Sequence, residues 1–179
     1  MDESKQESPG AAPPSAASAF DVELMRRAIA AAREGERQPG ASPIGCVIAV
    51  DGKIVAVAHN EVGIQHDPTA HAEMVAIRRA CAALAQDDLR GAHLYSTLQP
   101  CGMCTMASIW SHVGRIVYGA GRGDVHRMYF EDRHLDTMNF ILDAYRTDIE
   151  VVGGVAAPEC ATLYYRPWDN PPPEEQGNI

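Results

Sequence analysis

The sequence lacks an apolar run long enough to cross a bilayer, although 46% of its 179 residues are hydrophobic. It also lacks a recognisable secretory signal, because residues 1–19 are polar and rich in Pro, Ala and Ser, without an apolar core. Five cysteines, an odd number with no export signal, predict reduced thiols rather than a disulfide framework. These absences predict a cytoplasmic protein with no membrane partner.

A basic stripe is missing as well. The formal net charge is −9, and the Arg and Lys residues are scattered along the chain. Proteins that bind nucleic acid draw much of their affinity from Lys and Arg contacts to phosphate. The charge therefore favours a small-molecule partner over nucleic acid, without excluding nucleic acid.

What the sequence does contain is a histidine, a glutamate and two cysteines at a defined spacing. The segment HAE carries His71 and Glu73, and the segment PCGMC, 30 residues after the histidine, carries Cys101 and Cys104. The order H-x-E followed by P-C-x-x-C is typical of zinc deaminases that act on nucleobases. Alone, the C-x-x-C pair would equally fit a structural zinc site, a redox pair or two buried thiols.

These residue types suit a catalytic zinc site. A catalytic zinc ion has three protein ligands and keeps its fourth position for water, and His71, Cys101 and Cys104 would supply the three. Glu73 would accept a proton from that water and deliver it to the ring and then to the departing amine. A closed structural site would need a fourth ligand, and the nearest residues of suitable type have no distinctive spacing: His66, Cys81 and His112.

The spacing also predicts where two helices begin. Cys101 and Cys104 share one face if a helix opens at Cys101, directly after Pro100. Residues two apart do not share a face inside a helix, so His71 and Glu73 converge only if His71 stands at the extreme start of its helix. We therefore expect the site to be assembled from two helix starts.

Helical and strand patterns alternate along the chain and predict an α/β domain with a mixed sheet between helices. The turn Asp51-Gly52 predicts a hairpin between two of the strands. The predicted helices cover approximately residues 20–36, 69–84, 102–112, 135–145 and 158–165. The predicted strands cover residues 44–50, 53–58, 92–98, 115–120 and 149–153. The predicted organisation is a disordered leader (1–19), one zinc deaminase domain (20–166) and a Pro-rich acidic tail (167–179).

With these motifs, residues 20–165 resemble the cytidine deaminase-like superfamily. The resemblance implies a three-layer α/β/α sandwich with a mixed five-stranded sheet and zinc ligands at the starts of two helices. It implies that His71, Cys101 and Cys104 bind Zn²⁺ and that Glu73 carries the proton. It also implies a homodimer and a hydrolase that acts on C–N bonds of cyclic amidines.

Segments of this sequence are similar to two branches of the superfamily. The segments PIGCVIAVDGKIVAVAHN, HDPTAHAEMVAIRRA and SHVGRIVYGA resemble both bacterial tRNA adenosine deaminases and bacterial guanine deaminases. The segment IEVVGGVAAPECATL is more similar to the tRNA enzymes. Those enzymes continue with a basic helix, where this chain has YYRPWDNPPPEEQ, and with a Gly- and Ala-rich turn, where it has GDVHRMYFEDRHL.

Candidate substrate-binding residues follow from the same resemblance. Glu131 and Asp132 lie in a stretch similar to the Phe-Asp-Asp of guanine deaminases, and either carboxylate would accept hydrogen bonds from a substrate amine; a solvated acidic turn is the alternative. Asn60 would bond a base edge, unless it only shapes a turn. Ala72 lies between the zinc ligand and the proton carrier. Trp110 would stack on a base or fill the core, and we expect the core.

These observations predict a zinc-dependent deaminase of a free aminated heterocycle. Guanine is the first substrate expected, ahead of cytosine, an aminotriazine or a related ring. The alternative is a tRNA-specific adenosine deaminase, and an alternative of another class is a catalytically silent, zinc-stabilised dimeric binding module. The sequence leaves open the identity of the ring, the choice between the two carboxylates and whether the tail exchanges between subunits.

Overall fold

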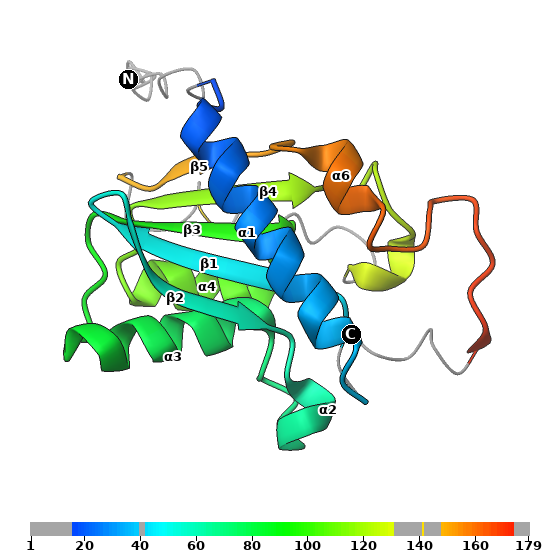
Figure 1. Ribbon diagram of the computed structural model, residues 1–179, viewed down its shortest axis with the longest axis horizontal. Coiled ribbons are helices and arrows are strands. Elements are labelled where there is room, and N and C mark those ends of the chain that lie inside the picture. The colour runs from blue at the N-terminus through cyan, green and yellow to red at the C-terminus, as the bar shows by residue number, and fades with distance from the viewer. Residues whose placement is uncertain (1–15, 40–41, 131–140, 142–147, 174–179) are drawn as a thin grey trace, which may run out of the picture.

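Five strands form one mixed sheet in the computed structural model, which describes residues 16–39, 42–130, 141 and 148–173 (Figure 1). In spatial order the strands are β2 (Lys53–His59), β1 (Gly45–Val50), β3 (Ala92–Leu98), β4 (Arg115–Ala120) and β5 (Glu150–Val152). β1 pairs antiparallel with β2 and β3, whereas β4 pairs parallel with β3 and β5. This arrangement confirms the predicted mixed five-stranded sheet.

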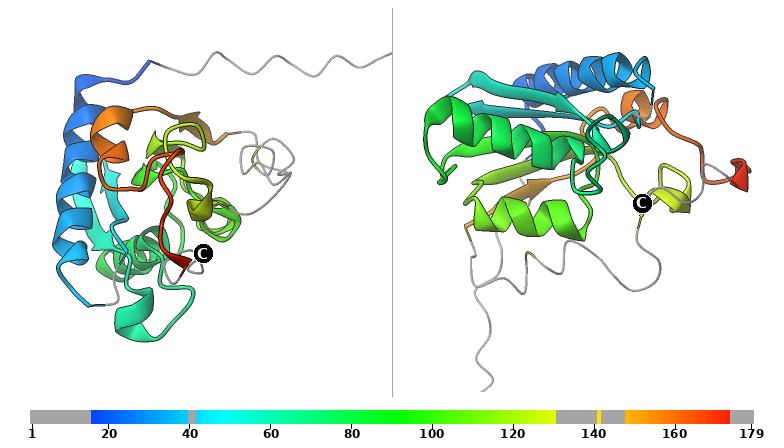
Figure 2. Two further views of the ribbon diagram at one scale, coloured as in Figure 1. Left: turned by 90° about the vertical axis from the view of Figure 1, so that its right-hand side faces the viewer. Right: turned by 90° about the horizontal axis from the view of Figure 1, so that it is seen from below.

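Helices cover both faces of the sheet and confirm the predicted three layers. α1 (Ala19–Glu36) and α6 (Ala157–Ala161) lie on one face, and α3 (Ala72–Leu84) and α4 (Gly102–Trp110) lie on the other (Figure 2). Each face has its own cluster of buried apolar side chains. Since burial of apolar surface is the main favourable term in folding, both layers stabilise the central sheet.

The first helix shows how local sequence and packing agree. Ser18 and Asp21 form a capping box, with each side chain bonded to the other residue's backbone N–H. The buried face of α1 then crosses β1 very closely. A Cβ atom at Gly45 would lie 2.0 Å from the carbonyl oxygen of Ala28, so only glycine allows this crossing.

The hairpin between β1 and β2 confirms the prediction from Asp51-Gly52. These two residues have φ angles of 48° and 75°, as a two-residue turn with both φ values positive requires. The turn sets the pairing of Val50 with Lys53.

Several helix boundaries differ from the prediction for local reasons. α3 begins at Ala72 rather than near residue 69, because the Asp67 carboxylate accepts the backbone N–H of Thr69 at 2.8 Å and forms a turn there. α4 ends at Trp110, two residues before His112, whose φ of 60° is left-handed. The last predicted helix is shorter than expected, because α6 ends at Ala161.

Two short elements were not predicted from the sequence: α2 (Val62–Gln65) and the 3-10 helix η1 (Arg127–Tyr129). The helix predicted at 135–145 lies outside the described residues except at 141, and so does most of the leader, residues 1–15. The domain limits at 19 and 166 therefore stay predictions. Among the described residues, no helix is both long and apolar enough to span a membrane, and a cytoplasmic location stays a prediction.

The topology places two strand ends and two helix starts at one edge of the sheet. β3 and β4 are parallel and end at the same edge, and α4 begins directly after β3 there (Figure 1). α3 also begins at this edge, after the loop that follows β2. Loops beyond the carboxyl ends of strands are where ligands bind in open α/β sheets.

Candidate zinc and catalytic site

The two predicted helix starts are confirmed. His71 is the N-cap of α3, with extended backbone angles, and its carbonyl accepts the backbone N–H of Val75 at 2.9 Å. Cys101 is the N-cap of α4, also extended, and its carbonyl accepts the N–H of Thr105 at 2.9 Å. Cys104 then lies in the first turn of α4. Two helix starts at one edge of the sheet thus bring three ligand-type residues together.

The three side chains have the dimensions of a tetrahedral zinc site. The Nδ1 atom of His71 lies 3.6 Å from the Sγ atom of Cys101 and 3.7 Å from that of Cys104. All three ligand atoms lie within 4.8 Å of one another. Zinc–sulfur bonds of about 2.3 Å and zinc–nitrogen bonds of about 2.0 Å at tetrahedral angles place nitrogen and sulfur roughly 3.6 Å apart. The donor set therefore fits Zn²⁺, with His71 coordinating through Nδ1.

The pKa values of the two thiols move in opposite directions. The contact with Cys104 lowers the pKa of Cys101 to about 4, although burial opposes this change. The same contact and burial raise the pKa of Cys104 well above its usual value. The start of α4, with its positive dipole end, adds to the stabilisation of a thiolate. A zinc ion would displace the thiol proton, because cysteine binds zinc as the thiolate.

Glu73 lies beside the ligands in the first turn of α3 and is only 3% exposed. Ser96 on β3 donates its hydroxyl to Oε1 at 3.0 Å, and the Cys104 thiol donates to Oε2 at 3.5 Å. Burial raises the pKa of Glu73, and the negative charge of Cys101 raises it further. A bound divalent cation would counter part of this rise. A carboxylate with a raised pKa beside the ligands is suited to proton transfer near neutral pH.

Ser96 was missed by the sequence analysis. It is fully buried in the middle of β3, between two other residues with hydroxyl groups, Tyr95 and Thr97. A polar residue in a strand that is buried on both faces needs a partner. That requirement was the available signal, but the partner, Glu73, is 23 residues away in the sequence.

Asn60 follows β2 and is 4% exposed. Its Oδ1 accepts the backbone N–H of Val62 at 3.2 Å, which orients the amide and leaves that oxygen a second lone pair. The neighbouring Glu61 bonds through its backbone N–H to the carbonyl of Ala70 at 2.9 Å. Asn60 precedes Glu61 and His71 follows Ala70, so this hydrogen bond joins the residues next to Asn60 and His71. Contact of Asn60 with a substrate stays a prediction.

The other predicted substrate residues have different outcomes. Ala72 is fully buried at the start of α3, between His71 and Glu73. The expectation that Trp110 fills the core is wrong, because this side chain is 73% exposed at the end of α4. Glu131 and Asp132 lie outside the described residues.

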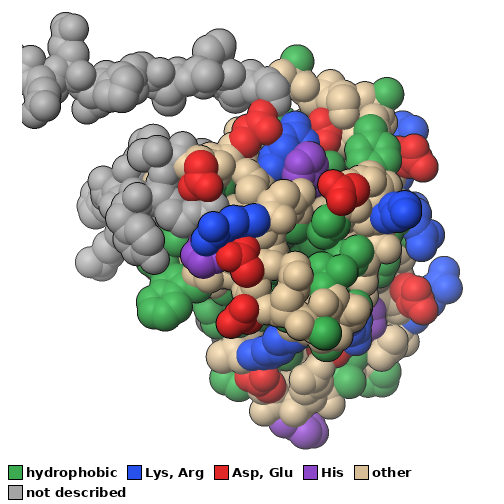
Figure 3. All heavy atoms as spheres, turned by 90° about the vertical axis from the view of Figure 1, so that its left-hand side faces the viewer, with side chains coloured by type: hydrophobic (Ala, Val, Ile, Leu, Met, Phe, Trp, Pro, Cys, Tyr) green, Lys and Arg blue, Asp and Glu red, His purple; other side chains and the backbone are tan. Residues whose placement is uncertain are grey.

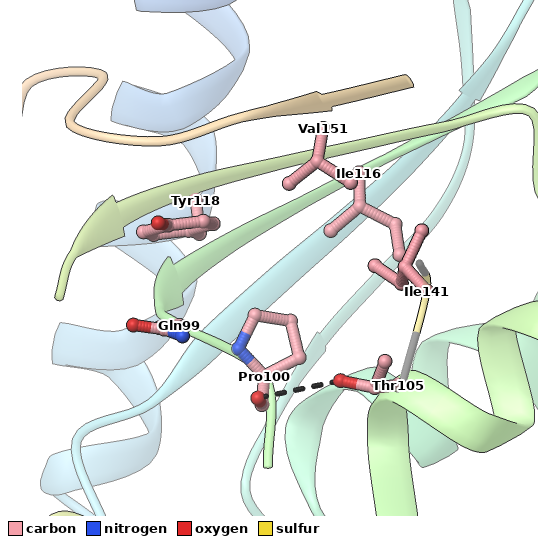
Figure 4. A pocket seen from close by; sticks show the side chains of 7 residues that line it. All are labelled: Gln99, Pro100, Thr105, Ile116, Tyr118, Ile141 and Val151. Atoms are coloured by element: carbon pink, nitrogen blue, oxygen red, sulfur yellow. Dashed lines mark hydrogen bonds between the residues drawn. The ribbon is translucent and has the colours of Figure 1, made fainter. Parts of the chain in front are cut away.

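A small hollow lies behind the start of α4, where the Thr105 hydroxyl bonds to the carbonyl of Pro100 (Figure 4). Its volume is about 10 Å³, room for about one water molecule, so it does not hold an aromatic ring. It is lined by Gln99, Pro100, Thr105, Ile116, Tyr118, Ile141 and Val151.

Comparison with known proteins places the site in a family. The family model for the cytidine and deoxycytidylate deaminase zinc-binding region matches residues 18–120, which include all three ligands and Glu73. The tRNA-specific adenosine deaminase of Bacillus subtilis (strain 168) is 37% identical over 149 residues, covering 80% of this chain and 85% of that protein. The guanine deaminase of the same organism is 39% identical over 109 residues, covering 61% and 70%.

A solved structure from a study of A-to-I editing by tRNA:A34 deaminases at the wobble position of transfer RNA is also similar. It has a TM-score of 0.66 and 35% identity, and the match covers 79% of this chain and 98% of that one. Together the matches confirm the predicted superfamily, the zinc cofactor and the enzyme class, a hydrolase acting on C–N bonds. They leave the roles of individual residues as predictions.

Proposed function

The chain belongs to the family of the cytidine and deoxycytidylate deaminase zinc-binding region, and from that premise we propose that it deaminates adenosine in tRNA. The supporting observation is the share of the chain over which the similarity extends. The tRNA enzyme aligns over a larger share of the chain than the guanine deaminase does, and 149 aligned residues must continue past residue 120. This support reverses the order expected from the sequence, in which guanine stood first.

Residues of the described segment 148–173 pack on the sheet that carries the site. Cys160 of α6 is fully buried against β4, where a Cβ atom at Gly119 would lie 2.2 Å from its sulfur. Val155 donates its backbone N–H to the carbonyl of Tyr118 at 3.1 Å. The segment that contains Val155 and Cys160 therefore packs on the strand next to β3, rather than forming a detached tail.

In the proposed reaction, water adds to C6 of adenine and ammonia leaves, so that the amine becomes a carbonyl. Zinc held by His71, Cys101 and Cys104 would supply the Lewis acid that activates water near neutral pH. Glu73 takes one proton from the water and delivers it to the ring nitrogen N1. It then takes a second proton from the hydroxyl group added at C6, which becomes the carbonyl, and passes it to the departing amine, so one carboxylate acts as base and then as acid. Ser96 holds Glu73 in place for both transfers.

Asn60 and Ala72 are the proposed contacts to the base. The amide of Asn60 would bond an edge of the ring, and the small side chain of Ala72 leaves room beside Glu73. An enzyme of this kind reaches its base only in an unstacked nucleotide, which the single-stranded anticodon loop provides. These assignments support an RNA loop rather than a duplex as substrate.

The proposed partner in solution is a second copy of the chain. Met106 and Trp110 are one turn apart on α4 and are 38% and 73% exposed. A large apolar side chain with this exposure is suited to an interface. Light scattering after gel filtration should give twice the monomer mass, and a W110D substitution should reduce it to the monomer mass.

A free-base guanine deaminase is the second candidate. The net charge of −9 and the guanine deaminase relative favour it. Figure 3 shows the face at the opposite end of the strands from the zinc site, and acidic and basic side chains are interspersed there. An RNA enzyme with this charge should bind its substrate with an affinity that falls as salt is added.

The discriminating experiment measures ammonia release by the zinc-loaded protein. The panel contains an anticodon stem-loop with adenosine at the wobble position, the same stem-loop with guanosine there, and the free bases adenine, guanine and cytosine. We expect turnover of the adenosine stem-loop alone. Turnover of guanine without the stem-loop would overturn the proposal in favour of the second candidate. If the zinc-loaded protein releases ammonia from none of these compounds, the result would favour the catalytically silent binding module.

A further inference from the structure

The loop between β2 and α3 carries a proposed substrate contact at one end and a zinc ligand at the other. Asn60 directly follows β2, and His71 caps α3. The backbone hydrogen bond from Glu61 to Ala70, 2.9 Å long, closes the neck of this loop. Movement of the neck would therefore change the position of Asn60 relative to His71, which α3 holds.

The side chain of Glu61 lies inside the neck, and the residue is 7% exposed. Its Oε1 accepts a hydrogen bond from Nη2 of Arg79 at 2.6 Å, and its other oxygen accepts one from Nε2 of Gln65. Nη1 of Arg79 donates to the carbonyl of Val57 at 2.9 Å. One guanidinium on α3 therefore ties the neck to β2 and to α3 at the same time.

The adjacent arginine makes a comparable pair at the tip of the same loop. Nη1 of Arg78 lies 3.5 Å from the carboxylate of Asp67, and their side chains are 50% and 35% exposed. Nη2 of Arg78 also donates to the hydroxyl of Thr69 at 3.1 Å. This pair also joins an arginine of α3 to a carboxylate of the same loop, but it is longer and its carboxylate is more exposed, so it serves as a matched control.

We infer that Glu61 and Arg79 are positioning residues for the deamination: their ion pair fixes the neck so that Asn60 meets the substrate while His71 keeps its place. The inference rests on the proposed function. A nearly buried carboxylate must be paired, so removing Arg79 leaves an uncompensated charge in the neck. Removing the charge of Glu61 instead releases the half-exposed guanidinium from the neck. The neck then relaxes, and Asn60 moves away from the base edge. Neither partner acts on the reacting atoms.

The test compares E61Q and R79M with the control substitutions R78M and D67N. The full zinc-loaded chain is used, and the measurements are kcat and KM for the stem-loop, together with bound zinc. For E61Q and R79M, we expect KM to rise about ten-fold while kcat changes by less than about three-fold. We expect bound zinc to stay unchanged. The control variants should stay within about two-fold of the original KM.

Two further variants separate positioning from a general loss of structure. The KM of the double variant E61Q/R79M should be no higher than that of the more impaired single variant, because the two substitutions remove the same interaction. R79K keeps the charge but has a single ammonium in place of the forked guanidinium, so it should recover part of the lost affinity. An unchanged KM, an equal effect of R78M, or a loss of activity that follows a loss of zinc would overturn the inference.

The outcomes also separate this inference from the proposed function. If the unsubstituted protein deaminates guanine but not RNA, the proposed function fails, and the same variants test the neck with guanine. If it deaminates the stem-loop and E61Q leaves KM unchanged, only the inference fails.

Discussion

Two nearly buried carboxylates, Glu73 at the zinc site and Asp21 at the start of α1, have opposite environments. They are 3% and 1% exposed, so exposure does not distinguish them. Burial would raise the pKa of Asp21, but hydrogen bonds from Arg115 and Ser18 outweigh burial and lower it. Glu73 has a hydroxyl and thiols as neighbours, and burial raises its pKa. Burial acts on both carboxylates in the same direction, so their partners set the difference between their pKa shifts.

This difference indicates a structural role for Asp21 and a role in proton transfer for Glu73. Arg115 at the start of β4 donates to Asp21 at 2.5 Å and 3.2 Å, and Tyr95 donates to it at 3.0 Å. These bonds join α1 to β3 and β4 through a permanently charged group. Glu73, by contrast, has a pKa that moves towards neutral pH and can both take and give a proton.

The largest expected effect comes from removing the chemical carboxylate. The substitution E73A should lower kcat by at least about 10²-fold to 10⁴-fold, because a general acid–base contributes about that much. Bound zinc should stay nearly unchanged, since the three ligands remain. Ammonia release and metal analysis of the same preparation would check both. Activity that survives E73A would rule out Glu73 as the proton carrier.

A smaller effect, on stability rather than turnover, should follow from removing the partner of the structural carboxylate. R115M should lower the free energy of unfolding by about 3 kcal/mol, the lower end of the range for breaking a buried pair. Urea denaturation would measure it, and turnover per folded molecule should stay unchanged. The matched control is R26M, because Arg26 pairs with Glu159 at the surface and its loss should change stability much less.

The pH dependence of the same measurement sharpens the comparison. The pKa of Asp21 is lowered on folding, so its stabilising contribution is present above the unfolded-state pKa of about 4 and is lost as pH falls through the folded-state value. The stability difference between R115M and the unsubstituted protein should therefore shrink at acidic pH. A difference that stayed constant down to pH values of about 2 would contradict the assignment.

The smallest expected effect concerns the hydroxyl that supports Glu73. S96A removes the hydrogen bond to Oε1, which stabilises the charged form, so the pKa of Glu73 should rise further. We expect kcat to fall about ten-fold and the acid limb of the pH–rate profile to move to higher pH. S108A is the matched control, because the Ser108 hydroxyl bonds only a backbone carbonyl, that of Cys104. An acid limb that stays in place in S96A would remove Ser96 from the mechanism.

Much of the fold and the metal centre could be predicted because the necessary information is local. Asp51-Gly52 specifies a hairpin by its backbone preferences alone. The pairs His71 with Glu73 and Cys101 with Cys104 each lie within one helical turn, so their spacing restricts where the helices begin.

The supporting residues could not be predicted because their partners are distant in the sequence. Ser96 meets Glu73 only because β3 lies beside α3, and Arg79 reaches Glu61 across 18 residues. The core position predicted for Trp110 was wrong because an apolar residue on a helix is usually buried, whereas here α4 ends with that side chain exposed. The preference for guanine over tRNA relied partly on net charge, which describes the whole chain and not the surface around the site. It also relied on Glu131 and Asp132, which lie outside the described residues.

The most direct test of the central claim, a zinc-dependent deaminase built on His71, Cys101 and Cys104, is a zinc titration of the metal-depleted protein. Ammonia release from the adenosine stem-loop would be measured at each step, beside the free bases. The account predicts that activity rises in proportion to bound zinc and stops rising at one zinc per chain. Full turnover without zinc, or one bound zinc with no turnover of any of these substrates, would contradict it.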